Sequence, residues 1–152
     1  MSFLLDTGIL LRLVDKQDPR HALVGEALTR LGDAGALLCI ATQNAAEFYN
    51  VATRPVANNG LGLSPSQALK LLEHEIEPLC SIVHEPATLY PELKRLIAKY
   101  NVVAKQVHDA RLAAMMLVWK IDDILTLNDR DFRRYESEGL RIVTPEMLIN
   151  TP

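Results

Sequence analysis

The sequence lacks an apolar run long enough to cross a membrane. Its longest uninterrupted apolar stretch covers residues 112–119 and ends at Lys120, whereas a membrane-spanning helix needs about 20 apolar residues. A secretory leader is also lacking, because Asp6 interrupts the first apolar stretch and no basic residue precedes it. We therefore expect a cytoplasmic protein that makes no membrane contact.

Cysteine is scarce, and its two copies, Cys39 and Cys80, lie in apolar segments that favour burial in a core. A zinc site needs about four closely spaced ligands, which the four histidines do not supply. A disulfide would be unusual in the cytosol. We therefore expect two buried thiols rather than a metal site or a cross-link.

Neither sign of charge is in large excess, since 16 basic and 19 acidic residues give a net charge of −3. This balance argues against a general polyanion binder. It does not exclude a nucleic-acid enzyme, because bound cations can bring a phosphate to an acidic protein. Hydrophobic residues make up 49% of the 152 residues, which excludes disorder and allows one domain, residues 1–152, with a core that needs no disulfide.

Strands and helices alternate along the chain. Short apolar runs predict strands over residues 3–6, 37–40, 81–84, 124–127 and 140–143. Helical spacing predicts helices over residues 7–14, 19–34, 42–53, 87–100, 107–121, 131–138 and 145–149, and another that begins at residue 64. This alternation predicts an α/β fold, a three-layer α/β/α sandwich with a mostly parallel central sheet. Ligands of such sheets bind beyond the carboxyl ends of the strands.

Helix-start signals are present at two places. Ser64 is expected to cap a helix that has Pro65 at its first position and Gln67 as the reciprocal partner of a capping box. Thr42 is a plausible N-cap for the helix that follows the second strand.

Two acidic side chains follow the first two predicted strands. Asp6 closes the first strand, where a carboxylate is costly unless it is paired, and its alternative role is to cap the next helix. Glu47 lies in the helix after the second strand, on a mixed face with Asn44, Val51 and Arg54 that is compatible with a cleft. The alternative for Glu47 is a solvated side chain.

A third acid, Asp109, lies in the first turn of a largely apolar helix, on the same face as Leu112, Ala113 and Met116. The helix dipole would contribute roughly 0.3–1 kcal/mol there, which does not explain why the acid is on the buried side. A functional role is therefore favoured for Asp109.

A fourth acidic cluster follows a late strand. Asp131 is the better ligand candidate, because a first helical turn can direct it back to the edge of the sheet, and Asp129 is the reserve. The alternative for Asn128 and Asp129 is to cap the next helix.

These acids would repel one another if they converged. Two unit charges 4 Å apart cost about 4 kcal/mol at an effective dielectric near 20, so several together need a hard cation such as Mg²⁺ or Mn²⁺. Such an ion suits phosphoryl chemistry because it polarises a phosphodiester and activates water. The sequence contains no Ser-His-Asp signature, nucleophile elbow or P-loop.

At this point the chain resembles the PIN-domain family, and within it the VapC-like toxin ribonucleases, over nearly its whole length. The resemblance is carried by residues 3–7 (FLLDT), Glu47, residues 107–114 (VHDARLAA) and residues 125–132 (LTLNDRDF). It implies an α/β/α fold and a Mg²⁺- or Mn²⁺-dependent endoribonuclease that hydrolyses single-stranded or loop RNA.

The resemblance also implies roles for particular residues. The catalytic acids would be Asp6, Glu47, Asp109 and Asp131. Asp6 and Asp109 would hold the principal metal. Glu47 and Asp131 would complete the cluster of acids or orient the attacking water, and Asp131 is also a candidate metal ligand. The polar residues next to these acids that would hold them in place are Thr7, Thr126, Asn128 and Asp129. Some relatives carry a second acid at the position of Asn128, so a second metal is expected to bind weakly.

Candidate RNA contacts are the arginines near these segments, namely Arg12, Arg54, Arg111 and Arg130. For each of them alone, an ordinary surface cation is the alternative. His108 is expected to be structural or supporting rather than a general base. The resemblance further implies an antitoxin partner and a homodimer.

Two other functions compete with the nuclease. One is an inactive PIN-like module that binds nucleic acid or protein without a competent metal site. The other is a different phosphotransfer enzyme on a related fold. A haloacid-dehalogenase-type phosphatase would need a second Asp where the chain has Gly8, so this alternative is disfavoured.

Overall fold

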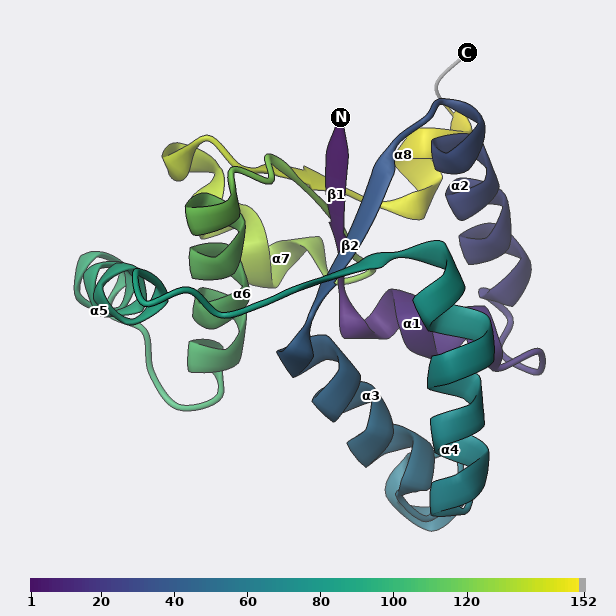
Figure 1. The fold of residues 1–152 in the computed structure, drawn as a ribbon. Helices are drawn as coiled ribbons and strands as arrows, with labels where there is room; N and C mark the ends of the chain where they lie inside the picture. Colours follow the sequence, from purple (N-terminus) through teal and green to yellow (C-terminus); the bar gives the residue numbers. More distant parts are fainter. Residues whose placement is uncertain (151–152) are drawn as a thin grey trace.

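The computed structural model describes residues 1–150, which form a fully parallel sheet of strand order β3-β2-β1-β4-β5 (Figure 1). The strands are β1 (Ser2–Leu5), β2 (Leu37–Ala41), β3 (Ser81–Val83), β4 (Asp123–Leu125) and β5 (Arg141–Val143). Each predicted strand is present, and its ends lie within two residues of the predicted ones. The predicted parallel sheet is therefore confirmed.

Helices connect and cover these strands. The α-helices are α1 (Thr7–Val14), α2 (His21–Asp33), α3 (Thr42–Thr53), α4 (Pro65–Leu71), α5 (Leu89–Tyr100), α6 (Gln106–Trp119), α7 (Asp129–Phe132) and α8 (Pro145–Asn150). Shorter helical segments are the 3₁₀-helices η1 (Val56–Asn58), η3 (Glu77–Leu79) and η4 (Arg133–Glu138) and the π-helix η2 (Leu72–Ile76).

Alternation along the central strand separates two cores. Phe3 and Leu5 pack in a cluster with residues of α1, α2, α3 and α4, whereas Leu4 packs with residues of α5 and α6. Successive side chains of a strand point to opposite faces of the sheet, so the sheet lies between two helical layers. Figure 1 shows α1 and α2 on one side of the strands and α6 on the other. The three-layer α/β/α sandwich is thus confirmed.

The order of the strands changes direction between β1 and β4. The chain proceeds from β1 outward through β2 and β3, and then returns to the other side of β1 to form β4. Connections that leave neighbouring strands in opposite directions open a ligand crevice between them. Asp6 N donates to Leu125 O at 3.0 Å across this point, so the residues after both strands lie side by side.

The capping predictions have mixed outcomes. Ser64 Oγ accepts from Gln67 N at 3.2 Å and Gln67 Oε1 accepts from Ser64 N at 2.9 Å, which confirms the capping box. The prediction for Thr42 was wrong, because β2 runs directly into α3 and makes Thr42 the first helical residue. Instead, Asn44 Oδ1 accepts from the backbone N–H of Ala41 at 2.9 Å.

Both cysteines are free thiols. Cys39 is buried in the core as predicted, whereas Cys80 is only half-buried and donates to the backbone oxygen of Ile76. Within residues 1–150, no helix is long and apolar enough to span a membrane.

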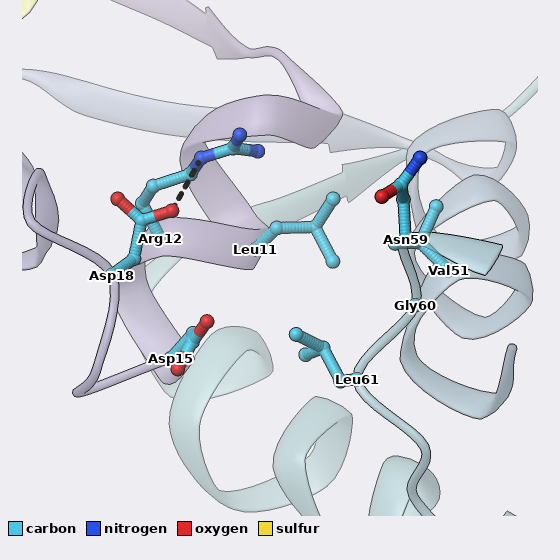
Figure 2. Close-up of a pocket in the computed structure, with 8 residues that line it drawn as sticks. All are labelled: Leu11, Arg12, Asp15, Asp18, Val51, Asn59, Gly60 and Leu61. Carbon is cyan, nitrogen blue, oxygen red and sulfur yellow. Dashed lines mark ion pairs between the residues drawn. The ribbon is translucent and has the colours of Figure 1, made fainter. Parts of the chain in front are cut away.

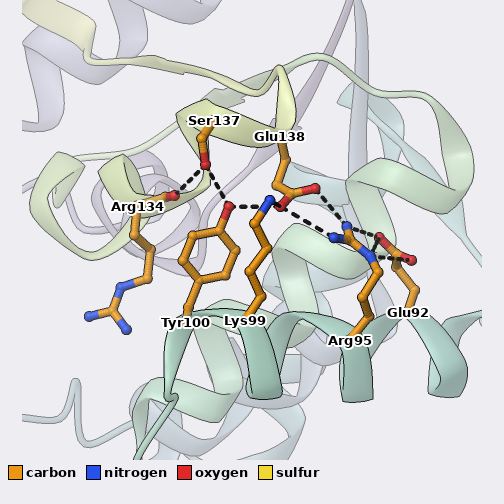
Figure 3. Close-up of polar contacts among 7 residues, drawn as sticks. All are labelled: Glu92, Arg95, Lys99, Tyr100, Arg134, Ser137 and Glu138. Carbon is orange, nitrogen blue, oxygen red and sulfur yellow. Dashed lines mark hydrogen bonds and ion pairs between the residues drawn. The ribbon is translucent and has the colours of Figure 1, made fainter.

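A charged cluster around Glu138 fastens α5 to η4 (Figure 3). Glu138 accepts hydrogen bonds from Arg95 at 2.6 Å, Lys99 at 2.6 Å and the Tyr100 hydroxyl at 2.7 Å. The hydrogen bond from Arg95 is the largest of the effects that lower the pKa of Glu138 to about 2. We call this group the Glu138 cluster, and it holds the segment that follows α7.

Candidate active site

Asp6 is both a helix cap and a member of the site. Its Oδ1 accepts from the backbone N–H of Thr7 at 2.8 Å, at the N-terminus of α1, and its Oδ2 accepts from Thr126 Oγ1 at 2.6 Å. Burial raises the pKa of Asp6, against the lowering effect of these two hydrogen bonds, and the charges of Glu47 and Asp131 raise it further. The capping role considered for Asp6 is therefore confirmed, and the same side chain also contacts the segment that follows β4.

Glu47 is half-buried rather than solvated. Its Oε2 accepts from Thr7 Oγ1 at 2.8 Å, and its Oε1 accepts from Gln43 Nε2 at 2.7 Å. Asn44 Nδ2 donates in turn to Thr7 Oγ1 at 3.3 Å. Both oxygens of Glu47 are thus held by neutral donors from α1 and α3, so the carboxylate has a defined orientation.

Asp109 faces the same group of acids from the first turn of α6. Burial is the main reason that the pKa of Asp109 rises to about 6. The charges of Asp131, Asp6 and Glu47 raise it further, against a smaller lowering effect from His108. Mutual repulsion of this kind requires that the acids lie close together.

The two acids of the fourth cluster point in different directions. Asp131 is exposed and accepts a hydrogen bond from the side-chain amide of Asn128. Asp129 forms an ion pair with Arg133 one turn further along, and the hydrogen bond from that arginine lowers the pKa of Asp129. The reserve candidate is therefore already paired with a basic side chain. Asn128 is the N-cap residue of α7 but makes no side-chain capping bond.

Thr126 links the last acid-bearing segment to Asp6. It is fully buried, its hydroxyl donates to Asp6, and the same oxygen accepts from the backbone N–H of Asn128 at 3.0 Å. One side chain therefore holds the carboxylate after β1 and the loop after β4 at the same time.

The donor set fits a hard divalent cation in charge and in chemistry. Within residues 1–150, none of the four acids takes part in an ion pair with a basic side chain. Four carboxylates that repel one another without a protein cation are the kind of oxygen ligands that Mg²⁺ and Mn²⁺ bind. In the same part of the chain, no three Asp, Glu, His or Cys side chains are close enough to share one ion.

Arg12 approaches the acids from α1. A Cβ atom built on Gly8 would lie 4.0 Å from both Arg12 Nη1 and Asp6 Oδ2. Arg12 Nε lies 3.3 Å from Asp18 Oδ2, on the wall of a pocket of about 220 Å³ between α1 and the end of α3 (Figure 2). Arg12 is thus already paired with an acid outside the site.

The other candidate RNA contacts differ in their surroundings. Arg111 forms an ion pair with Glu85, and its Nη1 donates to Gln43 Oε1 at 3.3 Å. In the described chain, neither Arg54 nor Arg130 forms an ion pair. Arg130 is exposed on α7, next to Asp131 in sequence, and no ion pair of the described chain balances its charge.

Comparison with known proteins agrees with this fold. The sequence profile of the PIN domain matches residues 3–138. The chain belongs to the PIN domain family. No curated protein matches the chain.

This PIN domain has the fold of the toxins in VapBC structures. It matches the structure of VapBC2 from Rickettsia felis bound to a promoter DNA fragment with a TM-score of 0.71 and 15% identity, over 95% of this chain and 98% of the other. It matches the structure of VapBC-1 from nontypeable Haemophilus influenzae with a TM-score of 0.68 and 14% identity, over 96% of this chain and 99% of the other. It matches the structure of VapC20 from Mycobacterium tuberculosis, a sarcin–ricin loop cleaving toxin, with a TM-score of 0.60 and 14% identity, over 91% of this chain and 96% of the other.

Reasoning from the sequence missed Gln43 in this PIN domain. Gln43 is buried and contacts both Glu47 and the backbone of His108. Its position four residues before Glu47, on the same face of α3, is the sequence signal that could have found it. His108 has an exposed side chain, and the contact to the site is made by its backbone oxygen.

Proposed function

We propose that this protein is a Mg²⁺- or Mn²⁺-dependent endoribonuclease and the toxin of a toxin–antitoxin pair. The observation that carries the proposal is the gathering of carboxylates from four separate segments near the carboxyl ends of β1 and β4. Glu47 and Asp131 act on the pKa of Asp6, and Asp131, Asp6 and Glu47 act on the pKa of Asp109. Burial of several like charges costs stability, and a cation-dependent reaction explains why the chain retains them.

The four acids have different roles in this proposal. Asp6 and Asp109 would be the principal metal ligands, with Asp131 as the third, and Glu47 would complete the metal site or orient the attacking water. When bound, the ion polarises the phosphodiester and lowers the pKa of water. Thr126 and Thr7 hold the carboxylates of Asp6 and Glu47 in place through hydrogen bonds of 2.6 and 2.8 Å. Attack in line with the leaving 3′ oxygen yields a 5′-phosphate and a 3′-hydroxyl.

The RNA and partner proposals rest on likeness to relatives as well as on this site. The similar structure of VapC20 is that of a sarcin–ricin loop cleaving toxin, which supports single-stranded or loop RNA as the substrate. The VapBC structures support an antitoxin partner, and we extend the proposal to a cytoplasmic homodimer. We assign Arg12, Arg54 and Arg130 to contacts with the RNA backbone, where Arg12 would have to exchange its ion pair with Asp18 for the phosphate.

The test is cleavage of RNA by the purified protein, freed of any antitoxin, in the presence of Mn²⁺. Asp6→Asn is the informative variant, because asparagine caps a helix about as well as aspartate and so preserves α1. Asp33→Asn, which removes an exposed acid at the end of α2, is the matched control.

We expect cleavage by the wild type and by Asp33→Asn, and its loss in Asp6→Asn. No cleavage by any of the three would favour the inactive PIN-like module. Equal cleavage by all three would mean that cleavage does not depend on Asp6 and would contradict the proposed site. Hydrolysis of small phosphoesters without cleavage of RNA would instead favour a different phosphotransfer enzyme.

A further inference from the structure

Gln43 connects the two helices that carry Glu47 and Asp109. Its side chain is 6% exposed. Nε2 donates to Glu47 Oε1 at 2.7 Å and also to the backbone oxygen of His108 at 2.9 Å. His108 directly precedes Asp109 on α6, so a single amide group ties the acid of α3 to the segment that positions the acid of α6.

The contacts of this amide fix the direction in which it points. Its two N–H donors face the oxygens of Glu47 and His108, and its Oε1 accepts from Arg111 Nη1 at 3.3 Å. A flipped amide would place its oxygen against two other oxygens and its N–H groups against a guanidinium. Arg111 is held in turn by its ion pair with Glu85, so the orientation of Gln43 is supported from outside the site.

The charge of the surrounding groups explains why a neutral donor suits this position. Glu47 lies among acids whose charges raise the pKa of Asp6 and Asp109. A basic residue at position 43 would neutralise Glu47 and compete with a metal ion for it. The amide instead supplies two hydrogen bonds without cancelling the negative charge that a cation needs.

We propose that Gln43 is a positioning residue that sets the spacing between Glu47 and Asp109, with Arg111 fixing its orientation. The inference rests on the proposed cation-dependent function of these acids. It gives Arg111 a role in the organisation of the site, in place of the RNA contact that the sequence predicted.

The test compares Gln43→Met with the wild type. Methionine has a similar length and helix propensity but no hydrogen-bonding amide. Loss of a partner that orients a metal ligand typically lowers metal affinity or activity about 10- to 100-fold. We expect a decrease of roughly tenfold in Mn²⁺ affinity, measured by calorimetric titration of the full chain without RNA, and a lower kcat for RNA cleavage with KM nearly unchanged.

Gln67→Met is the matched control, because it removes the same side chain from the capping box of α4 and leaves the acids untouched. It should lower Tm without changing Mn²⁺ affinity. If Gln43→Met behaved in the same way, with a lower Tm but wild-type Mn²⁺ affinity and kcat, Gln43 would be only structural and the proposal would fail.

A double-mutant cycle separates positioning from general loss of structure. If Gln43 acts through Glu47, Gln43→Met should not lower Mn²⁺ affinity further in a Glu47→Gln background, and additive losses would overturn the proposal. A wild type that binds Mn²⁺ but cuts no RNA would refute the proposed nuclease. The Mn²⁺ affinities of the wild type and of Gln43→Met would in that case still test the positioning role of Gln43. Absence of Mn²⁺ binding by the wild type would overturn both.

Discussion

Asp109 is expected to weaken the metal-free fold, so Asp109→Asn should stabilise the protein while it abolishes RNA cleavage. Burial, followed by the charges of Asp131, Asp6 and Glu47, raises the pKa of Asp109 from 3.8 to about 6. At 1.36 kcal/mol for each pKa unit, the ionised form would cost the fold about 3 kcal/mol. Because the side chain is only half-buried and water screens the repulsion, we expect about 1–2 kcal/mol.

The pH dependence of this effect has a definite sign. An acid whose pKa is higher in the folded state destabilises the fold once pH exceeds its unfolded pKa, and the cost is complete above its folded pKa. The free energy of unfolding of Asp109→Asn should therefore exceed that of the wild type at about pH 8. The difference should shrink below about pH 6 and vanish below pH 3.8, the ordinary pKa of aspartate.

Urea denaturation in the presence of EDTA measures this difference directly. Added Mn²⁺ should then stabilise the wild type more than the variant, because a ligand that binds only the folded state raises its stability. Asp33→Asn, an exposed acid at the end of α2, should change stability by less than about 0.5 kcal/mol at either pH. A less stable Asp109→Asn at about pH 8 would mean that Asp109 is a structural residue, and the reasoning would be refuted.

Two further predictions concern regions outside the acids. Glu138→Gln should lower the free energy of unfolding by about 1–2 kcal/mol at neutral pH. Glu75→Gln, which changes an exposed glutamate, is the control. Because the folded pKa of Glu138 is depressed to about 2, this contribution should persist above the unfolded pKa and disappear as pH falls towards 2; a cost independent of pH would contradict it. Gly60→Ala should lower stability by about 2 kcal/mol or more in urea denaturation, because a Cβ would lie 2.0 Å from the backbone oxygen of Arg54. Gly25→Ala, in open space on α2, should instead be neutral or stabilising, and equal effects of the two alanines would refute the steric argument.

The sequence allowed prediction of the features that depend on local pattern. Each strand is a short apolar run, and Asp6 and Asp131 could be placed near the sheet edge because each follows such a run closely. The preference for Asp131 over Asp129 followed from helical geometry, and Asp129 does face Arg133 on its own helix turn. The catalytic roles of these acids remain predictions.

Features that depend on contacts between distant segments could not be predicted. The partners of Gln43 are set by the approach of the first turn of α3 to the backbone of His108 at the start of α6, and periodicity does not specify such a contact. The pairing of Arg111 with Glu85 likewise brings a loop residue onto α6. Thr42 was misassigned because nothing local indicated that β2 would pass into α3 without an intervening residue.

The strand order has a consequence for synthesis of the protein on the ribosome. The central strand β1 is made first, but its neighbour β4 is encoded near the other end of the chain. A nascent polypeptide that has not yet emerged as far as Asp131 therefore lacks one of the four acids and the strand beside β1. The proposed cation site can assemble only after this segment has left the ribosome.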